Sequence, residues 1–74
     1  EGAALYAEIG RAIREARRDR EMSQEQLARA IEFARTSIVN IEAGRQRLTI
    51  DTLYDIADAL KIQAVSLLPR NEDV

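Results

Sequence analysis

The stretch SQEQLARAIEFARTSIVNIEAG, residues 23–44, decides the fold of this chain. It predicts two short helices on either side of a break at Glu32-Phe33-Ala34. Ser23 can cap the first helix by accepting a hydrogen bond from a free amide, and Gln26 can return one to the Ser23 amide, which completes a capping box. Apolar residues recur at helical spacing and predict one buried edge on each helix. These residues are Leu27, Ala28 and Ile31 in the first helix and Ile38 and Ile41 in the second.

The second of these helices is predicted to have two unlike sides. One side carries the apolar pair, while the opposite side carries short, uncharged side chains: Thr36, Val39, Asn40 and Ala43. A helix with such a surface can enter the major groove of DNA and touch the edges of base pairs.

In this segment the chain resembles the phage-repressor and Cro-like helix-turn-helix family, also called the xenobiotic-response-element family. The resemblance extends over roughly residues 8–69, and the ordered set of motifs is far more specific than any one of them. The matching residues are Ile13-Arg14, Arg17, Ser23-Gln24, Leu27-Ala28, Arg35-Thr36-Ser37-Ile38, Asn40-Ile41-Glu42 with Gly44, Thr52-Leu53, Ile56-Ala57 and Ala59-Leu60. The resemblance implies a compact, all-α, five-helix domain like that of the lambda repressor, with the helix-turn-helix at helices two and three.

Two residues depart from that family pattern. Glu32 stands where the family usually has Gly in the turn, and Ala34 stands where it usually has a Ser or Thr cap. If Glu32 adopts a positive φ, the conformation costs on the order of 1 kcal/mol. The missing cap at Ala34 costs about another 1 kcal/mol. We therefore expect a turn that differs in shape from the usual one.

The helical pattern continues on both sides of this segment. The predicted helices lie at about residues 5–21, 24–31 and 35–43, in a fourth segment that Thr49 caps, and at about 64–68. Gly44 is predicted to end the third helix. The fifth carries Val65 and Leu68 spaced three apart and ends at Pro69. Residues 1–74 are expected to form one domain, with a frayed tail at 70–74.

Composition excludes several classes of function. The chain has no Cys and no His, so disulfides, thiolate or imidazole metal sites and His-based catalysis are excluded. Asp51, Asp55 and Asp58 share one helical face, which predicts a solvated acidic surface rather than an active site or a metal site. No enzyme activity, cofactor or metal is therefore predicted. There is no apolar run of about 18 residues and no signal-peptide pattern, so we expect no membrane association and a cytoplasmic protein.

The net charge of −2 is unevenly distributed along the chain. Residues 10–50 have nine arginines against six acidic residues, a balance of +3, whereas residues 51–74 have a balance of −3. Such asymmetry suggests that the end holding the two short helices faces an anion.

The third helix supplies the predicted contacts to DNA bases: Arg35, Thr36, Val39 and Asn40. Asn can pair bidentately with adenine, Thr offers a hydroxyl and a methyl group, and Val39 can meet a thymine methyl. Arg35 begins the helix, where a cation opposes the helix dipole unless guanine or phosphate lies nearby. The alternative for all of them is an ordinary solvated helix face.

The predicted phosphate contacts are Ser23, Gln24, Arg45, Arg47 and Arg17. Ser23 and Gln24 lie at a helix N-terminus, whose free amides attract phosphate. Arg45 and Arg47 lie in a loop, where simple solvation is the alternative. The resemblance implies that Gln24 touches the DNA backbone and braces the third helix. It also implies that Arg17 forms an ion pair with Glu42 and lies near the backbone.

The resulting prediction is a transcriptional regulator, a repressor or controller, that binds double-stranded DNA sequence-specifically. We expect a homodimer on a pseudo-palindromic operator, with half-sites about 34 Å apart. The predicted dimer residues are Tyr54, Ile62, Val65 and Leu67, the last because it falls off the stripe of its helix. The alternative is a protein-interaction module, such as an antitoxin or adaptor, which the modest basic excess and the residues at positions 32 and 34 would favour.

Overall fold

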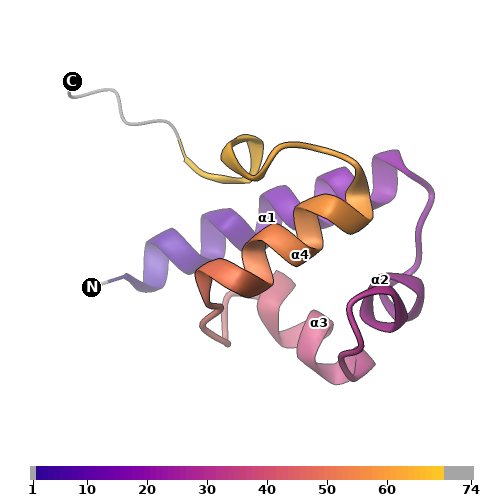
Figure 1. The fold of residues 1–74 in the computed structure, drawn as a ribbon. Helices are drawn as coiled ribbons and strands as arrows, with labels where there is room; N and C mark the ends of the chain where they lie inside the picture. Colours follow the sequence, from indigo (N-terminus) through magenta and orange to yellow (C-terminus); the bar gives the residue numbers. More distant parts are fainter. Residues whose placement is uncertain (1, 70–74) are drawn as a thin grey trace.

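The computed structural model describes residues 2–69, and all regular structure in that range is helical (Figure 1). The elements are α1 (Ala3–Asp19), α2 (Gln24–Ala30), α3 (Arg35–Glu42), α4 (Ile50–Leu60) and the 3-10 helix η1 (Ala64–Leu67). The expected all-α fold is thus confirmed, whereas the fraying expected at residues 70–74 lies outside the described residues. No helix within residues 2–69 has both the length and the apolar character that a membrane crossing requires.

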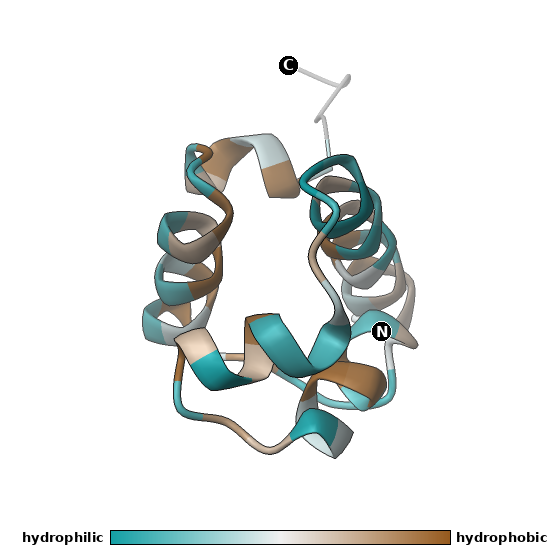
Figure 2. Ribbon diagram, turned by 90° about the vertical axis from the view of Figure 1, so that its right-hand side faces the viewer, coloured by the Kyte–Doolittle hydropathy of each residue, from teal (hydrophilic) through white to brown (hydrophobic). Residues whose placement is uncertain are grey.

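The helices surround an aliphatic core. Figure 2 shows α1 and α4 facing each other, with α2 and α3 closing the space between them on one side and η1 on the other. Each element contributes at least one fully buried side chain: Ile13, Leu27, Ile38, Ile41, Ile56, Leu60 and Leu67. Burying each such side chain stabilises the fold by about 1.5–3 kcal/mol relative to exposure, so this core holds α2 and α3 in place.

Two of the predicted helix caps are present. The Ser23 Oγ accepts from the Gln26 amide at 3.0 Å, and the Ser23 amide donates to the Gln26 Oε1 at 2.7 Å. This is the predicted capping box at the start of α2. The Thr49 Oγ1 accepts from the Thr52 amide at 3.1 Å and caps α4. Helix α3 begins at Arg35, and the preceding Ala34 provides no side-chain cap, as the sequence indicated.

All four α-helices end in the same way, with a left-handed residue just after the last turn. These residues are Glu21 (φ 54°), Glu32 (φ 62°), Gly44 (φ 77°) and Lys61 (φ 59°). After α2, for example, the Glu32 amide donates to the Arg29 carbonyl at 3.2 Å and the Phe33 amide to the Ala28 carbonyl at 2.8 Å. This pair of bonds is the Schellman motif. The positive φ anticipated at Glu32 is therefore present, and only Gly44 adopts it without strain.

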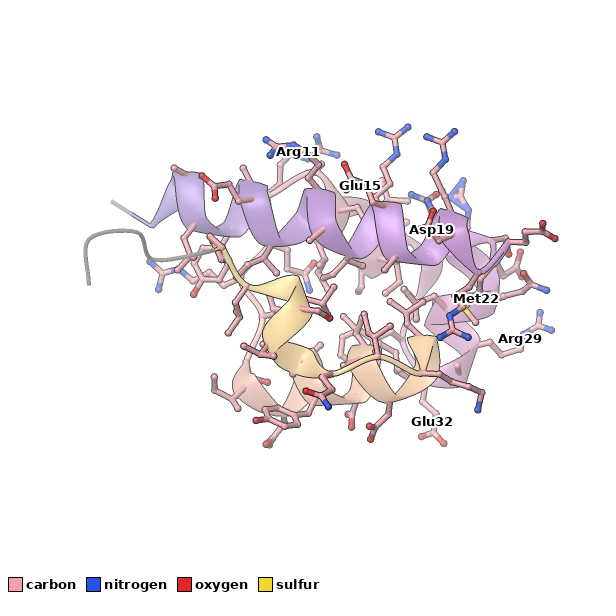
Figure 3. The ribbon with its side chains drawn as sticks, turned by 90° about the horizontal axis from the view of Figure 1, so that it is seen from above. Arg11, Glu15, Asp19, Met22, Arg29 and Glu32 are labelled. Carbon is pink, nitrogen blue, oxygen red and sulfur yellow. The ribbon has the colours of Figure 1, made fainter. Side chains whose placement is uncertain are left out.

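Replacing Glu32 by glycine is expected to stabilise the protein. The left-handed conformation costs a residue with a Cβ about 1–2 kcal/mol, part of which is offset by the greater freedom of glycine in the unfolded chain. The side chain of Glu32 projects outward (Figure 3), and it makes no hydrogen bond to another side chain within residues 2–69. We expect a gain of about 0.5–1 kcal/mol and a Tm raised by about 2–6 °C in thermal denaturation.

The matched control is Glu15→Gly, an exposed position in the middle of α1 with ordinary helical geometry. Glycine there should cost about 1 kcal/mol. A fall in Tm for Glu32→Gly comparable to that of Glu15→Gly would show that the turn is not strained.

The fifth helix differs from the prediction. It is a single turn of 3-10 helix rather than an α-helix, and its buried residues are Ala64 and Leu67. With three residues per turn, positions 64 and 67 share one side, and Val65 and Leu68 share the side that faces solvent. The spacing of Val65 and Leu68 therefore marks the exposed side of this turn rather than its buried side.

A glycine allows α1 and α3 to approach closely. Gly10 is buried in the middle of α1, and a Cβ placed on it would lie 2.3 Å from the Ile41 carbonyl oxygen and 2.6 Å from that of Glu42. Sequence reasoning gave Gly10 no role, although a glycine within a helical pattern signals close packing. Through this contact α1 supports the C-terminal end of α3.

Candidate nucleic-acid interface

Helix α3 has one side in the core and one side at the surface. Ile38, Ile41 and Glu42 are buried. On the other side Arg35 and Thr36 are exposed, and Val39 and Asn40 are partly exposed. The four residues predicted to contact bases therefore lie at the surface of the described structure. Neither Thr36 nor Asn40 packs into the interior.

The buried carboxylate of Glu42 joins three helices. It accepts hydrogen bonds from the Arg17 Nε at 2.6 Å, from the Arg17 Nη2 at 3.0 Å and from the Gln24 Nε2 at 3.1 Å. The Arg17 Nη1 donates to the Met22 carbonyl at 2.8 Å. Arg17 belongs to α1 and Gln24 to α2, so these bonds hold both helices against the end of α3. The bidentate geometry makes this a strong, directional pair.

Two of the predicted phosphate contacts, Arg17 and Gln24, take part in these hydrogen bonds to Glu42. The Arg17 side chain is only 11% exposed, and each of its three guanidinium nitrogens already donates to the protein. Arg17 is thus largely buried and forms with Glu42 the ion pair that the resemblance implied. Gln24 braces α3 through Glu42, as the resemblance implied, and remains partly exposed at the start of α2.

The loop after α3 returns to the surface of that helix. Gly44 turns the chain, and the Arg45 amide then donates to the Asn40 carbonyl at 2.9 Å. The Arg45 side chain also reaches Asn40, with its Nε 3.4 Å and its Nη2 3.2 Å from the Asn40 Oδ1. Arg47 is exposed in the same loop and, with Arg45, lines a hollow beside Tyr6 near the start of α1. The loop thus places Arg45 beside the exposed side of α3 and Arg47 near the start of α1.

Comparison with known proteins identifies the family. Residues 13–67, more than half of the chain, match the model of a family described as Helix-turn-helix, HTH_3. The chain belongs to this helix-turn-helix family. A relative from Rhodospirillum rubrum, named as an uncharacterized transcriptional regulator in ATPase CF(0) region, is 39% identical over 56 residues. The match covers 76% of this chain and 52% of the relative, so this chain spans about half of that protein's length.

Solved structures of two restriction-modification controller proteins have the same fold. The restriction-modification controller protein C.AhdI from Aeromonas hydrophila matches with a TM-score of 0.88 and 26% identity, over 92% of this chain and 99% of that protein. The controller protein C.Esp1396I matches with a TM-score of 0.77 and 32% identity, over 85% of this chain and 83% of that one. Its structure is that of a tetramer in complex with a natural 35 base-pair operator.

Sequence reasoning assigned no contact to Arg14, which lies beside α3 in this helix-turn-helix domain. Its side chain shares with Gln24, Val39 and Ala43 a surface hollow of about 370 Å³ where α1, α2 and α3 meet. The spacing along α1 was a signal for this placement, because positions 10, 14 and 17 share one side of the helix. Gly10 and Arg17 on that side both contact α3. Arg11, Glu15 and Asp19 instead follow another, exposed side of that helix (Figure 3).

The predicted dimer residues of the helix-turn-helix domain divide into two groups. Tyr54 and Val65 are 58% and 66% exposed, Ile62 is partly buried, and the three line one shallow hollow beside η1. Leu67 is only 1% exposed, because the 3-10 turn directs it into the core, and it is not available to a partner. That residue of the prediction was wrong. Leu68, which follows it, is 41% exposed.

Proposed function

We propose that this chain binds double-stranded DNA sequence-specifically as a transcriptional regulator, a repressor or controller. Helices α2 and α3 form its helix-turn-helix, and α3 enters the major groove. The observation that carries the proposal is the exposed side of α3, where Arg35, Thr36, Val39 and Asn40 stand on a helix whose other side is fixed in the core. These side chains offer donors, an acceptor and methyl groups, which are the groups that read base edges in the major groove.

Phosphate contacts come from both sides of the recognition helix. Ser23 and Gln24 lie at the N-terminus of α2, and Arg45 and Arg47 lie in the loop after α3. Contacts of this kind set the register of a protein on the duplex without reading sequence. Arg14 joins this group, because it lines the same hollow as Gln24 and Val39.

A single recognition helix reads few base pairs, so the proposed regulator is a homodimer on a pseudo-palindromic operator. Half-sites would then repeat at about 34 Å, one turn of the duplex. The proposed dimer surface is the apolar group formed by the exposed Tyr54, Val65 and Leu68 with the partly buried Ile62. The controller C.Esp1396I, which is seen as a tetramer on its operator, supports assembly on DNA for a domain of this kind.

Selection from a randomised duplex library tests the proposal. The wild-type chain is expected to recover a pseudo-palindrome, and its log affinity should fall with log salt with a slope of several units. Asn40→Ala should relax the preference at one base pair of each half-site by about 1–3 kcal/mol. Arg47→Ala should weaken all duplexes about equally and reduce the salt slope by about 1 per subunit.

Two outcomes of this experiment would contradict different parts of the proposal. A flat salt dependence and no enriched sequence would contradict DNA binding and favour a protein partner. Enrichment of a single, non-repeated half-site would leave DNA binding intact and contradict the dimer.

A further inference from the structure

The contact between Arg45 and Asn40 determines how the Asn40 carboxamide is turned. An arginine side chain has only donors, so the Asn40 atom that faces its Nε and Nη2 must be the carbonyl oxygen. The chemistry of the partner therefore distinguishes the oxygen of this amide from its nitrogen. Asn40 Nδ2 is left with both of its hydrogens outside this contact.

The backbone holds Arg45 in place for this contact. The left-handed Gly44 turns the chain after α3, and the Arg45 amide closes a hydrogen bond to the Asn40 carbonyl. Gly44 also packs on α1, because a Cβ on it would lie 2.8 Å from the Cα of Ala7. Both the main chain and the side chain of Arg45 thus donate to Asn40, and the turn between them is fixed against another helix.

We propose that Arg45 is a positioning residue that sets the base preference of Asn40. This inference rests on the proposed function and goes beyond a phosphate contact. An Asn side chain recognises adenine by donating to N7 and accepting from the N6 amino group, so reversing the amide exchanges its donor and acceptor. With both Arg45 nitrogens directed at Oδ1, only the orientation of the amide that turns Nδ2 away from the guanidinium remains favourable.

The neighbouring Arg47 makes a matched comparison possible. It lies in the same loop, carries the same charge and is exposed, and its side chain makes no hydrogen bond among the described residues. The loss of a positive charge by itself should lower DNA affinity to a similar extent at positions 45 and 47. A loss of orientation at Asn40 should follow only from changes at position 45.

The test begins with the sequence that the wild-type chain selects from a randomised duplex library. At every base pair of that sequence, it measures how strongly the protein prefers the selected base. Asn40→Ala identifies the base pair that Asn40 reads. We expect Arg45→Ala to reduce the preference at that base pair about threefold or more and to leave the others unchanged, whereas Arg47→Ala lowers affinity for all duplexes without changing any preference. In the Asn40→Ala background, Arg45→Ala should change no preference further.

Arg45→Lys separates charge from geometry. Lysine keeps the positive charge but lacks the guanidinium fork that donates from two nitrogens to one oxygen. It should preserve most of the affinity while still reducing the preference at the Asn40 base pair. All variants are compared at equal folded fraction, measured by circular dichroism.

Two results would overturn the inference while leaving DNA binding intact. One is an Arg45→Ala profile that matches Arg47→Ala, with affinity lowered uniformly, which would make Arg45 a phosphate contact only. The other is an unchanged preference at all positions in Asn40→Ala. A wild-type chain that enriches no sequence would instead overturn the proposed function and this inference with it.

Discussion

Gly10→Ala is expected to destabilise the protein by about 3 kcal/mol or more, even though alanine is the better helix former by about 1 kcal/mol. The reason is the close crossing of α1 and α3. The new methyl group would lie 2.3 Å and 2.6 Å from two backbone carbonyl oxygens of α3, where no side-chain rotation can relieve the overlap. The helices must separate, and the packing of Ile13 and Ile41 is lost with them.

A loss of that size matters in so short a chain. A single core in a protein of about 70–80 residues rarely supplies more than about 3–5 kcal/mol. Urea denaturation of Gly10→Ala should therefore show a midpoint near zero denaturant or a largely unfolded chain at 37 °C. Arg11→Ala, the exposed neighbour on the same helix, is the control and should change stability by no more than about 0.5 kcal/mol. Stabilisation by Gly10→Ala would mean that helix propensity outweighs the crossing and that the two helices are farther apart.

Glu42→Ala is expected to cost about 3–5 kcal/mol, because it leaves the guanidinium of Arg17 buried without its counter-charge. The Glu42 side chain is only 4% exposed and accepts hydrogen bonds from both α1 and α2. The substitution removes all three of those bonds at once. Denaturant unfolding monitored by circular dichroism measures the loss.

A surface ion pair in the same protein provides the control. The Arg29 Nη2 lies 3.2 Å from the Glu25 Oε2, and the two side chains are 81% and 64% exposed. Such pairs contribute about 0–1 kcal/mol, so Glu25→Ala should have a small effect. Equal effects of Glu25→Ala and Glu42→Ala would contradict a buried pair.

The double variant Arg17→Met with Glu42→Met tests the physical origin of the loss. Replacing both charges by apolar side chains of similar size removes the cost of burying an unpaired ion. The double variant should therefore recover most of the stability that Glu42→Ala loses. Its fold is expected to keep the exposed side of α3, although Gln24 then has no acceptor on that helix.

Local features of the chain predicted much of the fold. The capping box at Ser23 and Gln26, the cap at Thr49 and the end of α3 at Gly44 each involve residues within a few positions of one another. Their hydrogen bonds form inside one helix or at its end, so spacing along the chain is enough to predict them. The same holds for the two sides of α3, because 3.6 residues per turn separates Ile38 and Ile41 from Thr36 and Asn40.

The short helix η1 was predicted less well for a physical reason. A segment of one turn is too short for its spacing to distinguish a 3-10 helix from an α-helix, and the two place different residues on the buried side. The chain therefore did not reveal that Leu67 packs inward. That choice was made by the packing of η1 against α1 and α4.

The amino-acid pattern alone predicted an all-helical chain with a capped α2 and an α3 that is apolar on one side only, whereas the positive φ at Glu32 came from the structure. Contacts between distant segments required the assembled molecule. Glu42 collects donors that lie 25 and 18 positions away, and Gly10 meets the backbone of a helix more than 30 residues later. Such contacts depend on how whole helices cross, which no local periodicity encodes. Asn40 and Arg45 are only five positions apart, but their contact depends on the left-handed turn at Gly44, which directs the Arg45 side chain back to α3.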